Sequence, residues 1–557
     1  MHLAERAREA LARPPLLLGA LAVVQWLVVG GIALSAQHNG WFWYQGGDET
    51  YYYTTSWLLG EGLLPPTPIG YGWSLLTVPA SLVGGANVLD ALPLIVLGQY
   101  LLLLPVGLVA VWVIGDCCGG RPLAISASAL WATLPALSIP LFAERYHPIY
   151  VDTVLPQLLG LTNLADFPST IAVLVSAALV LKGIERRSHE LVLLSALAAG
   201  FAIGIKPANV VFLAAPFLLL ALARRPDQLL VFAAGLLPAL ATLALWKERG
   251  LGHIPVLAQP EQVLATGSAL VVAVGGLSFD RYLDVDWDHL WLNLRQLQEV
   301  FWGIRVLEWF LIAGAFAVGR HSISKASFLV TWFGAYLVFK GASSPAIVQQ
   351  GSFFRLVQPA LPVVVILAAA CLLLVPSIAR KAGTSTASAT GPIQGRRLTV
   401  LTAGAAVLFG ALPFLVVAVV RPVHEHVLAA YSRDIVVTPV NAFPVEATRD
   451  GPRVRLQWET KDYNGTRAFY RVLRSEPGEG KDLLADVRDG LRCPTGDLPT
   501  QCTIFSDVIA TTRGSIYVDR PPPGRWTYRI AVSANAYDSF EEGDVVLVSN
   551  GAVVTLP

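Results

Sequence analysis

Two adjacent carboxylates, Asp48 and Glu49, come shortly after the first long apolar segment of the chain. Ionisable groups beside a bilayer are costly to place there and mark a functional site by default. Carboxylates can accept a proton from a hydroxyl as a general base, or bind a hard divalent cation through their oxygens. An aspartate before a helix can also simply cap it. The pair therefore has a catalytic and a structural interpretation.

Three more charged residues stand at the ends of other apolar runs. Asp166 opens one run with Phe167 and Pro168, Lys206 lies in a turn before Pro207, and Arg355 opens a late run. A carboxylate base can activate a hydroxyl, and cations can hold an anionic leaving group. Asp166 can alternatively cap a helix, and Lys206 can extend from the end of a span toward water.

The composition indicates a polytopic membrane protein. Of the 557 residues, 54% are hydrophobic and 14% are charged, far from the balance of a soluble domain. The net charge of +1 gives no basic field that would attract a nucleic acid. We expect about eleven transmembrane helices. The apolar runs are 14–36, 91–115, 122–142, 169–183, 190–205, 208–223, 228–246, 302–319, 325–340, 356–377 and 398–420.

The loop charges predict the orientation of these helices. With the N-terminus in the cytoplasm, alternation of the spans puts the basic loops on the cytoplasmic side, as the positive-inside rule requires. These loops carry Arg121, Lys182, Arg186, Arg187, Arg224, Arg225, Arg320, Lys325, Arg380, Lys381, Arg396 and Arg397. The same alternation puts Asp48, Asp166, Lys206 and Arg355 together on the outer side.

The chain divides into a membrane domain, 1–431, and a C-terminal domain, 432–557. Short alternating runs such as 454–458 and 526–532, separated by Gly, Pro and Asp turns, predict an extracytoplasmic all-β sandwich. A Trp in an early strand and a Tyr in a late one resemble a fibronectin type III domain. Cys493 and Cys502 can form a short disulfide loop there.

Two further stretches have no catalytic signature. The Gly/Ser/Thr-rich segment 378–397 predicts a flexible cytoplasmic linker. The acidic, aromatic segment 280–289 lacks the Gly and distal Glu of a calcium loop, and predicts an interfacial segment at the acceptor entrance.

The order of these motifs resembles the GT-C superfamily of membrane glycosyltransferases, in its protein O-mannosyltransferase-like and aminoarabinose transferase-like branch (family 39-type). The motifs are Gly46-Gly47-Asp48-Glu49, Asp166-Phe167-Pro168, Gly200–Pro207 with Lys206, and Phe353–Pro362 with Arg355. The resemblance covers residues 15–375. It implies a GT-C-like fold and a transferase that takes its sugar from a polyprenyl-phosphate donor.

The resemblance also implies roles for these residues. Asp48 is the base, and Asp166 assists it or helps to hold an acceptor or a metal. Lys206 and Arg355 hold the phosphate. Glu49, Tyr52 in the interfacial helix after Asp48, and His147 in the second outer loop are further candidate substrate contacts. A single base with direct displacement inverts the anomeric centre.

Several features stay open at this stage. Oxygen ligands suit Mg²⁺ or Mn²⁺, but superfamily members differ in their need for a metal. The acceptor is a cell-wall glycan, a lipid or a protein. The alternative function is a polytopic lipid or glycan transporter or flippase with an external binding domain. We expect a plasma-membrane protein with its active face outside, and the Ala-, Leu- and Arg-rich usage suggests a bacterial source.

Overall fold

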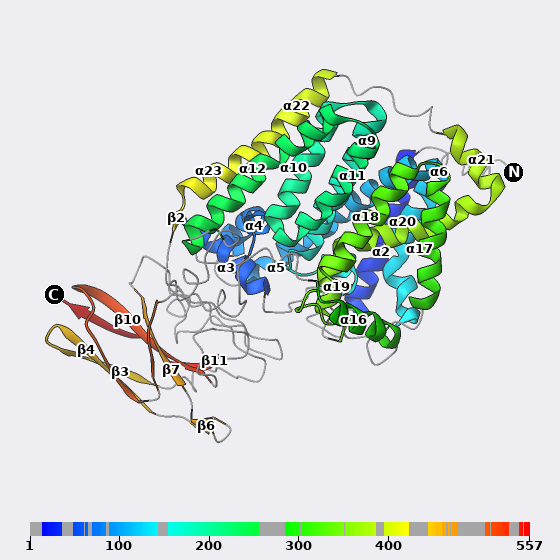
Figure 1. Ribbon diagram of the computed structural model, residues 1–557. Coiled ribbons are helices and arrows are strands. Elements are labelled where there is room, and N and C mark those ends of the chain that lie inside the picture. The colour runs from blue at the N-terminus through cyan, green and yellow to red at the C-terminus, as the bar shows by residue number, and fades with distance from the viewer. Residues whose placement is uncertain are drawn as a thin grey trace.

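The computed structural model describes residues 14–35, 48–60, 62–64, 69–84, 88–142, 154–252, 254, 285–300, 304–349, 351–385, 395–422, 444–459, 462–463, 466–467, 469–475, 507–512, 514–533, 545–549 and 551–557. The calls on His147, Gly46, Gly47, residues 280–284 and the Cys493/Cys502 pair lie outside these ranges. Figure 1 shows a helical part and, beyond one end of it, a part made of strands.

The described residues contain six helices that are long and apolar enough to cross a membrane. They are Pro14–Ser35, Ala91–Leu141, Asp166–Arg186, Pro226–Leu251, Ser352–Leu374 and Arg397–Val419. Four shorter apolar helices accompany them, namely His189–Ile205, Pro207–Leu222, Glu308–Gly319 and Ile323–Phe339. The length and apolar composition of these helices confirm the prediction of a multi-pass helical membrane protein.

The 51-residue stretch Ala91–Leu141 joins two runs that the sequence separates. Inside it, Gly119 (φ −153°, ψ 20°) and Gly120 (φ 67°, ψ −168°) leave helical geometry between the predicted runs 91–115 and 122–142. A positive φ is readily adopted only by glycine. In their described residues the eleven predicted runs are largely helical, and the prediction that all of them cross the bilayer stays a prediction.

The helices have the following bounds. They are α2 (Pro14–Ser35), α3 (Asp48–Gly60), α4 (Tyr71–Gly84), α5 (Val88–Gly98), α6 (Leu104–Ser138), α8 (Pro156–Leu159), α9 (Asp166–Arg186), α10 (His189–Ile205), α11 (Ala214–Leu222), α12 (Pro226–Leu251), α16 (Trp287–Val300), α17 (Ile304–Gly319), α18 (Ile323–Phe339), α19 (Ser352–Val357), α20 (Leu361–Ala370), α21 (Pro376–Ser385), α22 (Gly395–Ala406) and α23 (Leu412–Val419). Residues Gln99–Leu103 and Val407–Ala411 are π-helical, and Ile139–Leu141, Pro207–Leu213, Gln358–Ala360 and Cys371–Leu374 are 3-10 helical. Strands β1 (Leu63–Leu64) and β2 (Arg421–Pro422) pair in parallel.

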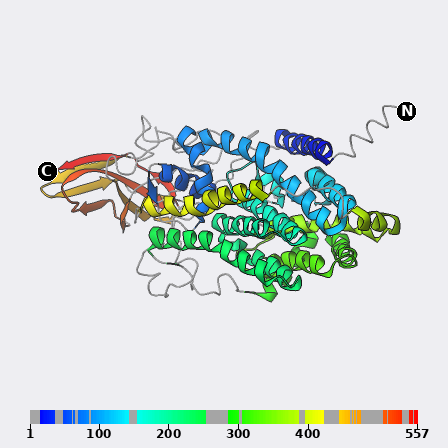
Figure 2. The same ribbon diagram turned by 90° about the horizontal axis from the view of Figure 1, so that it is seen from above.

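Small residues set the packing at the centre of the bundle. A Cβ on Gly200 of α10 would lie 2.7 Å from the Ala239 Cβ of α12, and one on Gly235 of α12 would lie 2.6 Å from the Ala196 Cβ of α10. Small residues at such crossings let two backbones approach within a membrane. The last helices, α22 and α23, run along α10 and α12 in both views (Figures 1 and 2).

The two ends of α9 carry two different ionic clusters. At its start, Asp166 meets Lys206 and Arg355. Near its end, Glu185 pairs with Lys182 at 3.1 Å and with Lys325 of α18 at 2.8 Å. A helix of 21 residues is about 30 Å long. Asp166, Lys206 and Arg355, which are predicted to lie outside, are therefore at the opposite end of α9 from Lys182 and Lys325, which are predicted to lie in the cytoplasm. Which end faces outward stays a prediction.

Most of the described strands from β3 onward lie in two antiparallel sheets. One has the order β3 (Val445–Asp450), β4 (Arg453–Trp458), β9 (Ile516–Asp519), and the other has β11 (Val545–Val548), β10 (Gly524–Ser533), β7 (Phe469–Ser475), β8 (Asp507–Thr512), with β12 (Ala552–Leu556) also on β10. A third pairing joins β5 (Asp462–Tyr463) and β6 (Thr466–Arg467).

The inner faces of the two sheets meet at aromatic side chains. Trp458 of β4 and Tyr470 of β7 are buried, with ring centroids 5.7 Å apart. Asp519 of β9 accepts hydrogen bonds from Tyr528 of β10 (2.7 Å) and from Arg474 of β7 (3.1 Å). The predicted strands around 454–458 and 526–532 are present, and the alternation of buried and exposed residues in β4 follows the predicted period of two.

The predicted flexible linker 378–397 is wrong in its first part. Residues Pro376–Ser385 form α21, which packs against α6. Pro376 opens this helix, where its missing N–H costs nothing, and the apolar Ile378 packs against the core. Composition alone indicated flexibility because the stretch is rich in small residues, whereas the apolar contact stabilises a helix.

Candidate active site

Asp48 and Glu49 open helix α3 but face different surroundings. The Asp48 side chain is 50% exposed, whereas Glu49 is fully buried. The Glu49 carboxylate accepts the backbone N–H of Asn163 at 2.5 Å, and its backbone carbonyl accepts the Asn163 side-chain amide at 3.1 Å. These bonds hold the start of α3 against the loop that leads into Asp166. Direct contact of Glu49 with a substrate stays a prediction.

Asp166 is the first residue of α9 and only 1% of its side chain is exposed. Its Oδ1 accepts a hydrogen bond from the Lys206 Nζ at 2.8 Å, and its Oδ2 accepts one from the Arg355 Nη2 at 3.2 Å. A carboxylate this deeply buried requires such partners to offset its lost hydration. The carboxylate of Asp166 thus binds cations rather than the N–H groups of its own helix, which carries no side-chain cap.

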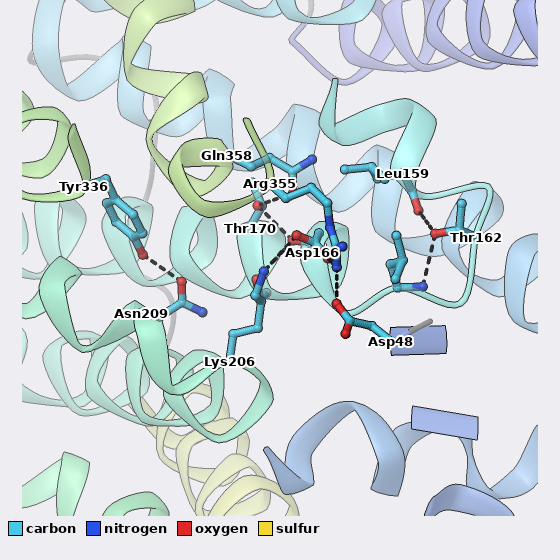
Figure 3. Close-up of polar contacts among 12 residues, drawn as sticks. Asp48, Leu159, Thr162, Asp166, Thr170, Lys206, Asn209, Tyr336, Arg355 and Gln358 are labelled. Atoms are coloured by element: carbon cyan, nitrogen blue, oxygen red, sulfur yellow. Dashed lines mark hydrogen bonds and ion pairs between the residues drawn. The ribbon is translucent and has the colours of Figure 1, made fainter. Parts of the chain in front are cut away.

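Arg355 joins the two carboxylates. The same Nη2 that contacts Asp166 lies 2.5 Å from the Asp48 Oδ2, across 307 residues of sequence (Figure 3). Asp48, Asp166, Lys206 and Arg355 therefore form one cluster with two negative and two positive charges. The structure brings together the four residues that the sequence placed on one side of the membrane.

The end of α10 positions Lys206. Lys206 leaves the helix in an extended conformation (φ −130°, ψ 108°), and the 3-10 turn that Pro207 begins follows it. A Cβ on Gly70 would lie 2.2 Å from the backbone oxygen of Gly204 and 2.5 Å from that of Ile205. The loop before α4 thus lies directly against the last turn of α10, and only glycine leaves room for it.

We expect Gly70→Ala to weaken both folding and the site. The added methyl group would meet backbone atoms, which cannot rotate away, so α10 and Lys206 must shift; overpacking of this kind costs about 1–3 kcal/mol. Thermal unfolding in detergent should show the loss. Gly334→Ala in α18 is the matched control, because a Cβ there meets nothing within 4 Å. Equal stability of the two variants would contradict this account.

A loop between α18 and α19 positions Arg355. Asn293 of the amphipathic helix α16 donates to the carbonyls of Gly341 (3.0 Å) and Ala346 (2.6 Å), and His289 bonds Ala346 at 2.7 Å. Gly351, at φ 79°, then turns the chain into α19, where Arg355 lies. In the described part of the predicted interfacial segment, residues 285–289, Trp287 is exposed, and an interfacial position stays a prediction.

Tyr52 lies one turn after Asp48 and is buried. Burial, followed by the charges of Asp48 and Asp166, raises the pKa of its phenol well above the ordinary value. The phenol stays protonated at neutral pH and can donate a hydrogen bond toward the cluster. A substrate contact by Tyr52 stays a prediction, as does one by His147.

The sequence did not single out Asn163 or Gln358. Asn163 connects Glu49 to the loop before α9 and accepts the Trp73 indole N–H at its carbonyl (2.7 Å). Gln358 follows Arg355 by one turn and accepts the Thr170 hydroxyl at 3.4 Å. Gln358 is a polar residue inside the apolar run 356–377, a signal that could have identified it, whereas Asn163 lies in the loop before the run 169–183.

The described carboxylates do not form a cation site in this arrangement. Both oxygens of Asp166 and one of Asp48 already contact a cationic side chain, and Glu49 bonds a backbone N–H. Among the described residues, no group of three His, Cys, Asp or Glu side chains could hold a metal ion. A requirement for Mg²⁺ or Mn²⁺ stays a prediction.

Comparisons with known proteins give distant structural neighbours. No protein-family model and no curated protein matches the chain. An Archaeoglobus fulgidus oligosaccharyltransferase in complex with zinc and sulfate is 14% identical, with a TM-score of 0.39 over 73% of this chain and 54% of that one. The same enzyme tethered to an acceptor peptide is 13% identical, with a TM-score of 0.40 over 73% of this chain and 55% of that one.

ArnT from Cupriavidus metallidurans bound to undecaprenyl phosphate is 15% identical, with a TM-score of 0.41 over 72% of this chain and 73% of that one. The chain spans about half the length of the oligosaccharyltransferase. Identities and TM-scores of this size assign neither a family nor an activity, so the function rests on the site itself.

Proposed function

We propose that this protein is an integral-membrane glycosyltransferase of the GT-C type that transfers a sugar from a polyprenyl-phosphate donor to an extracytoplasmic acceptor. The observation that carries the proposal is the cluster in which a half-exposed Asp48 lies beside Arg355, with Lys206 and the buried Asp166 behind it. It combines a base that solvent can reach with two cations, at the ends of apolar helices.

The cluster supplies what the reaction requires. Asp48 takes the proton of the acceptor hydroxyl as that oxygen attacks C1 of the sugar. The bond between C1 and the phosphate oxygen breaks, and its electron pair leaves with the phosphate, so the anomeric centre inverts. Arg355 has five N–H donors and Lys206 has three, so both can bind phosphate oxygens with the donors that Asp48 and Asp166 leave over. Asp166 keeps both cations in place.

The position of the cluster favours an enzyme over a transporter. Asp48 and Asp166 are the first residues of their helices, and Lys206 directly follows the last residue of its helix. Secondary transporters place their substrate sites near the bilayer midplane on broken helices. Charges at helix ends suit a reaction at the membrane surface.

The direct test is an assay of the purified protein in liposomes against a panel of polyprenyl-phosphate sugars. We expect one donor to lose its sugar to a hydroxyl acceptor. Movement of intact lipid across the bilayer without release of polyprenyl phosphate would instead support the flippase alternative.

We expect Lys206→Ala to weaken binding of polyprenyl phosphate about tenfold to a hundredfold, because a hydrogen bond to a charged group contributes about 1.5–3 kcal/mol. Lys325→Ala is the matched control. Lys325 is similarly exposed and pairs with Glu185 at the same 2.8 Å distance, at the other end of α9. Unchanged binding in Lys206→Ala would remove the lysine from the phosphate site.

We also infer that the strand-rich part is a fibronectin type III-like sandwich that holds a polymeric acceptor near the site. Its two antiparallel sheets face each other through Trp458 and Tyr470. At the end of the membrane domain, β2 pairs with β1 just after α3. This pairing holds the last described residues of the membrane domain beside the helix that carries Asp48.

A further inference from the structure

The side-chain amide of Gln358 is buried beside the ionic cluster with its nitrogen unsatisfied. Gln358 is 2% exposed, and among the described residues its Nε2 has no hydrogen-bond partner. Its Oε1 lies 3.4 Å from the Thr170 hydroxyl oxygen, whose single proton can go to this oxygen or to the Asp166 carbonyl at 2.9 Å. Figure 3 shows the amide nitrogen pointing away from Thr170.

A second donor beside it is also unsatisfied. The Nε of Arg355 is buried without a hydrogen-bond partner in the described part of the chain, although its Nη2 contacts both carboxylates. Gln358 follows Arg355 by three residues, a spacing that puts two side chains on one side of a helix. The side chains of Gln358 and Arg355 thus each have a buried N–H group without an acceptor among the described residues.

Unsatisfied buried donors are rare because each costs the hydration it has lost. Such a cost persists where a ligand supplies the missing acceptor. With the Thr170 proton on the amide oxygen, Gln358 offers only donors, and a ligand that binds it must present an acceptor. Phosphate oxygens are acceptors, and the adjacent Arg355 and Lys206 favour a negatively charged group.

We propose that Gln358 is a binding residue that donates its amide N–H groups to a phosphate oxygen of the polyprenyl-phosphate donor, beside the Nε of Arg355. This inference rests on the proposed function and adds a neutral side chain to the residues that bind the phosphate. Neutrality has a physical reason: the four charged residues already balance, and another buried cation would lack a counterion. An amide adds a hydrogen bond without adding charge.

The test is Gln358→Met, which keeps a similar size and removes the amide. We expect the affinity for a short-chain polyprenyl phosphate to fall about tenfold, the effect of losing a hydrogen bond to a charged group. In the absence of the lipid, the melting temperature should stay the same or rise, because the unsatisfied donor is gone. Opposite effects on binding and stability would not arise from a residue that only supports the fold.

Gln228→Met is the matched control. Gln228 is 1% exposed, but its Nε2 donates to the Gly183 carbonyl at 3.3 Å, far from the cluster. We expect this variant to lower the melting temperature and leave the affinity unchanged. Titration of inorganic phosphate against the bound lipid identifies the source of the anion: displacement assigns the site to phosphate in general, and no displacement assigns it to the lipid-linked group.

The outcomes separate this inference from the proposed function. A wild-type protein that binds no polyprenyl phosphate would overturn the proposed function. Wild-type binding that Gln358→Met leaves unchanged would overturn only the role of Gln358. A lower melting temperature in Gln358→Met would do the same, since it would mean that the amide already has a stabilising partner.

Discussion

Asp48→Asn should reduce sugar transfer by about 10²–10⁴-fold, the contribution expected of a positioned general base. Asparagine has nearly the same shape, and its side-chain oxygen can still accept the Arg355 hydrogen bond seen at Asp48 Oδ2. It cannot take the proton of the acceptor hydroxyl. The loss should therefore appear in the turnover rate, with little change in the melting temperature or in donor binding.

Asp227→Asn provides the control for this substitution. Asp227 is 54% exposed and pairs with His189 at 2.8 Å, away from the cluster. It tests the same chemical change at a carboxylate without a proposed role, and we expect full activity. Full transfer activity in a stable Asp48→Asn protein would show that Asp48 is not the base.

Asp166→Ala should affect stability as strongly as activity. Removing this carboxylate leaves Lys206 and Arg355 partly buried without their shared counterion, and breaking a buried pair costs about 3–5 kcal/mol. We expect a large fall in the melting temperature of the protein in detergent, together with loss of transfer. The contrast with Asp48→Asn is informative, because there the activity falls while the fold persists.

A second substitution separates the two effects of Asp166. In the double variant Asp166→Ala/Lys206→Met, one of the uncompensated cations is also removed, so part of the lost stability should return. Activity should not return, because the phosphate site then lacks its lysine. Additive losses of stability in the double variant would show that Asp166 and Lys206 do not interact as their 2.8 Å contact indicates.

The positions of the apolar helices could be predicted from the chain because membrane insertion is a local requirement. A bilayer demands about 20 apolar residues in a row, and a helix satisfies its own backbone, so hydropathy alone locates the segment. The grouping of Asp166, Lys206 and Arg355 could be predicted in the same way. Each residue stands at the end of an apolar run, and the loop charges assign all three of these ends to the outer side of the membrane. The structure places all three in contact.

The linker and the buried amides show where local reasoning stops. The composition of residues 378–385 predicted a flexible linker, but these residues belong to helix α21, which packs against α6. Gln358 lay within a motif whose charged residue drew attention, and only the packing around it shows that its amide nitrogen lacks a partner. Both depend on contacts with residues far away in the chain.

By itself the sequence determined that the chain is a membrane protein with ionisable residues at the ends of its apolar runs. The resemblance favoured Asp48 over Glu49 as the base, but the sequence did not show how differently the two carboxylates are placed. Adjacent residues on a helix point about 100° apart, so only one of them can face a given partner. The tertiary structure shows this difference: Asn163 binds Glu49 in the interior, and Arg355 contacts the half-exposed Asp48.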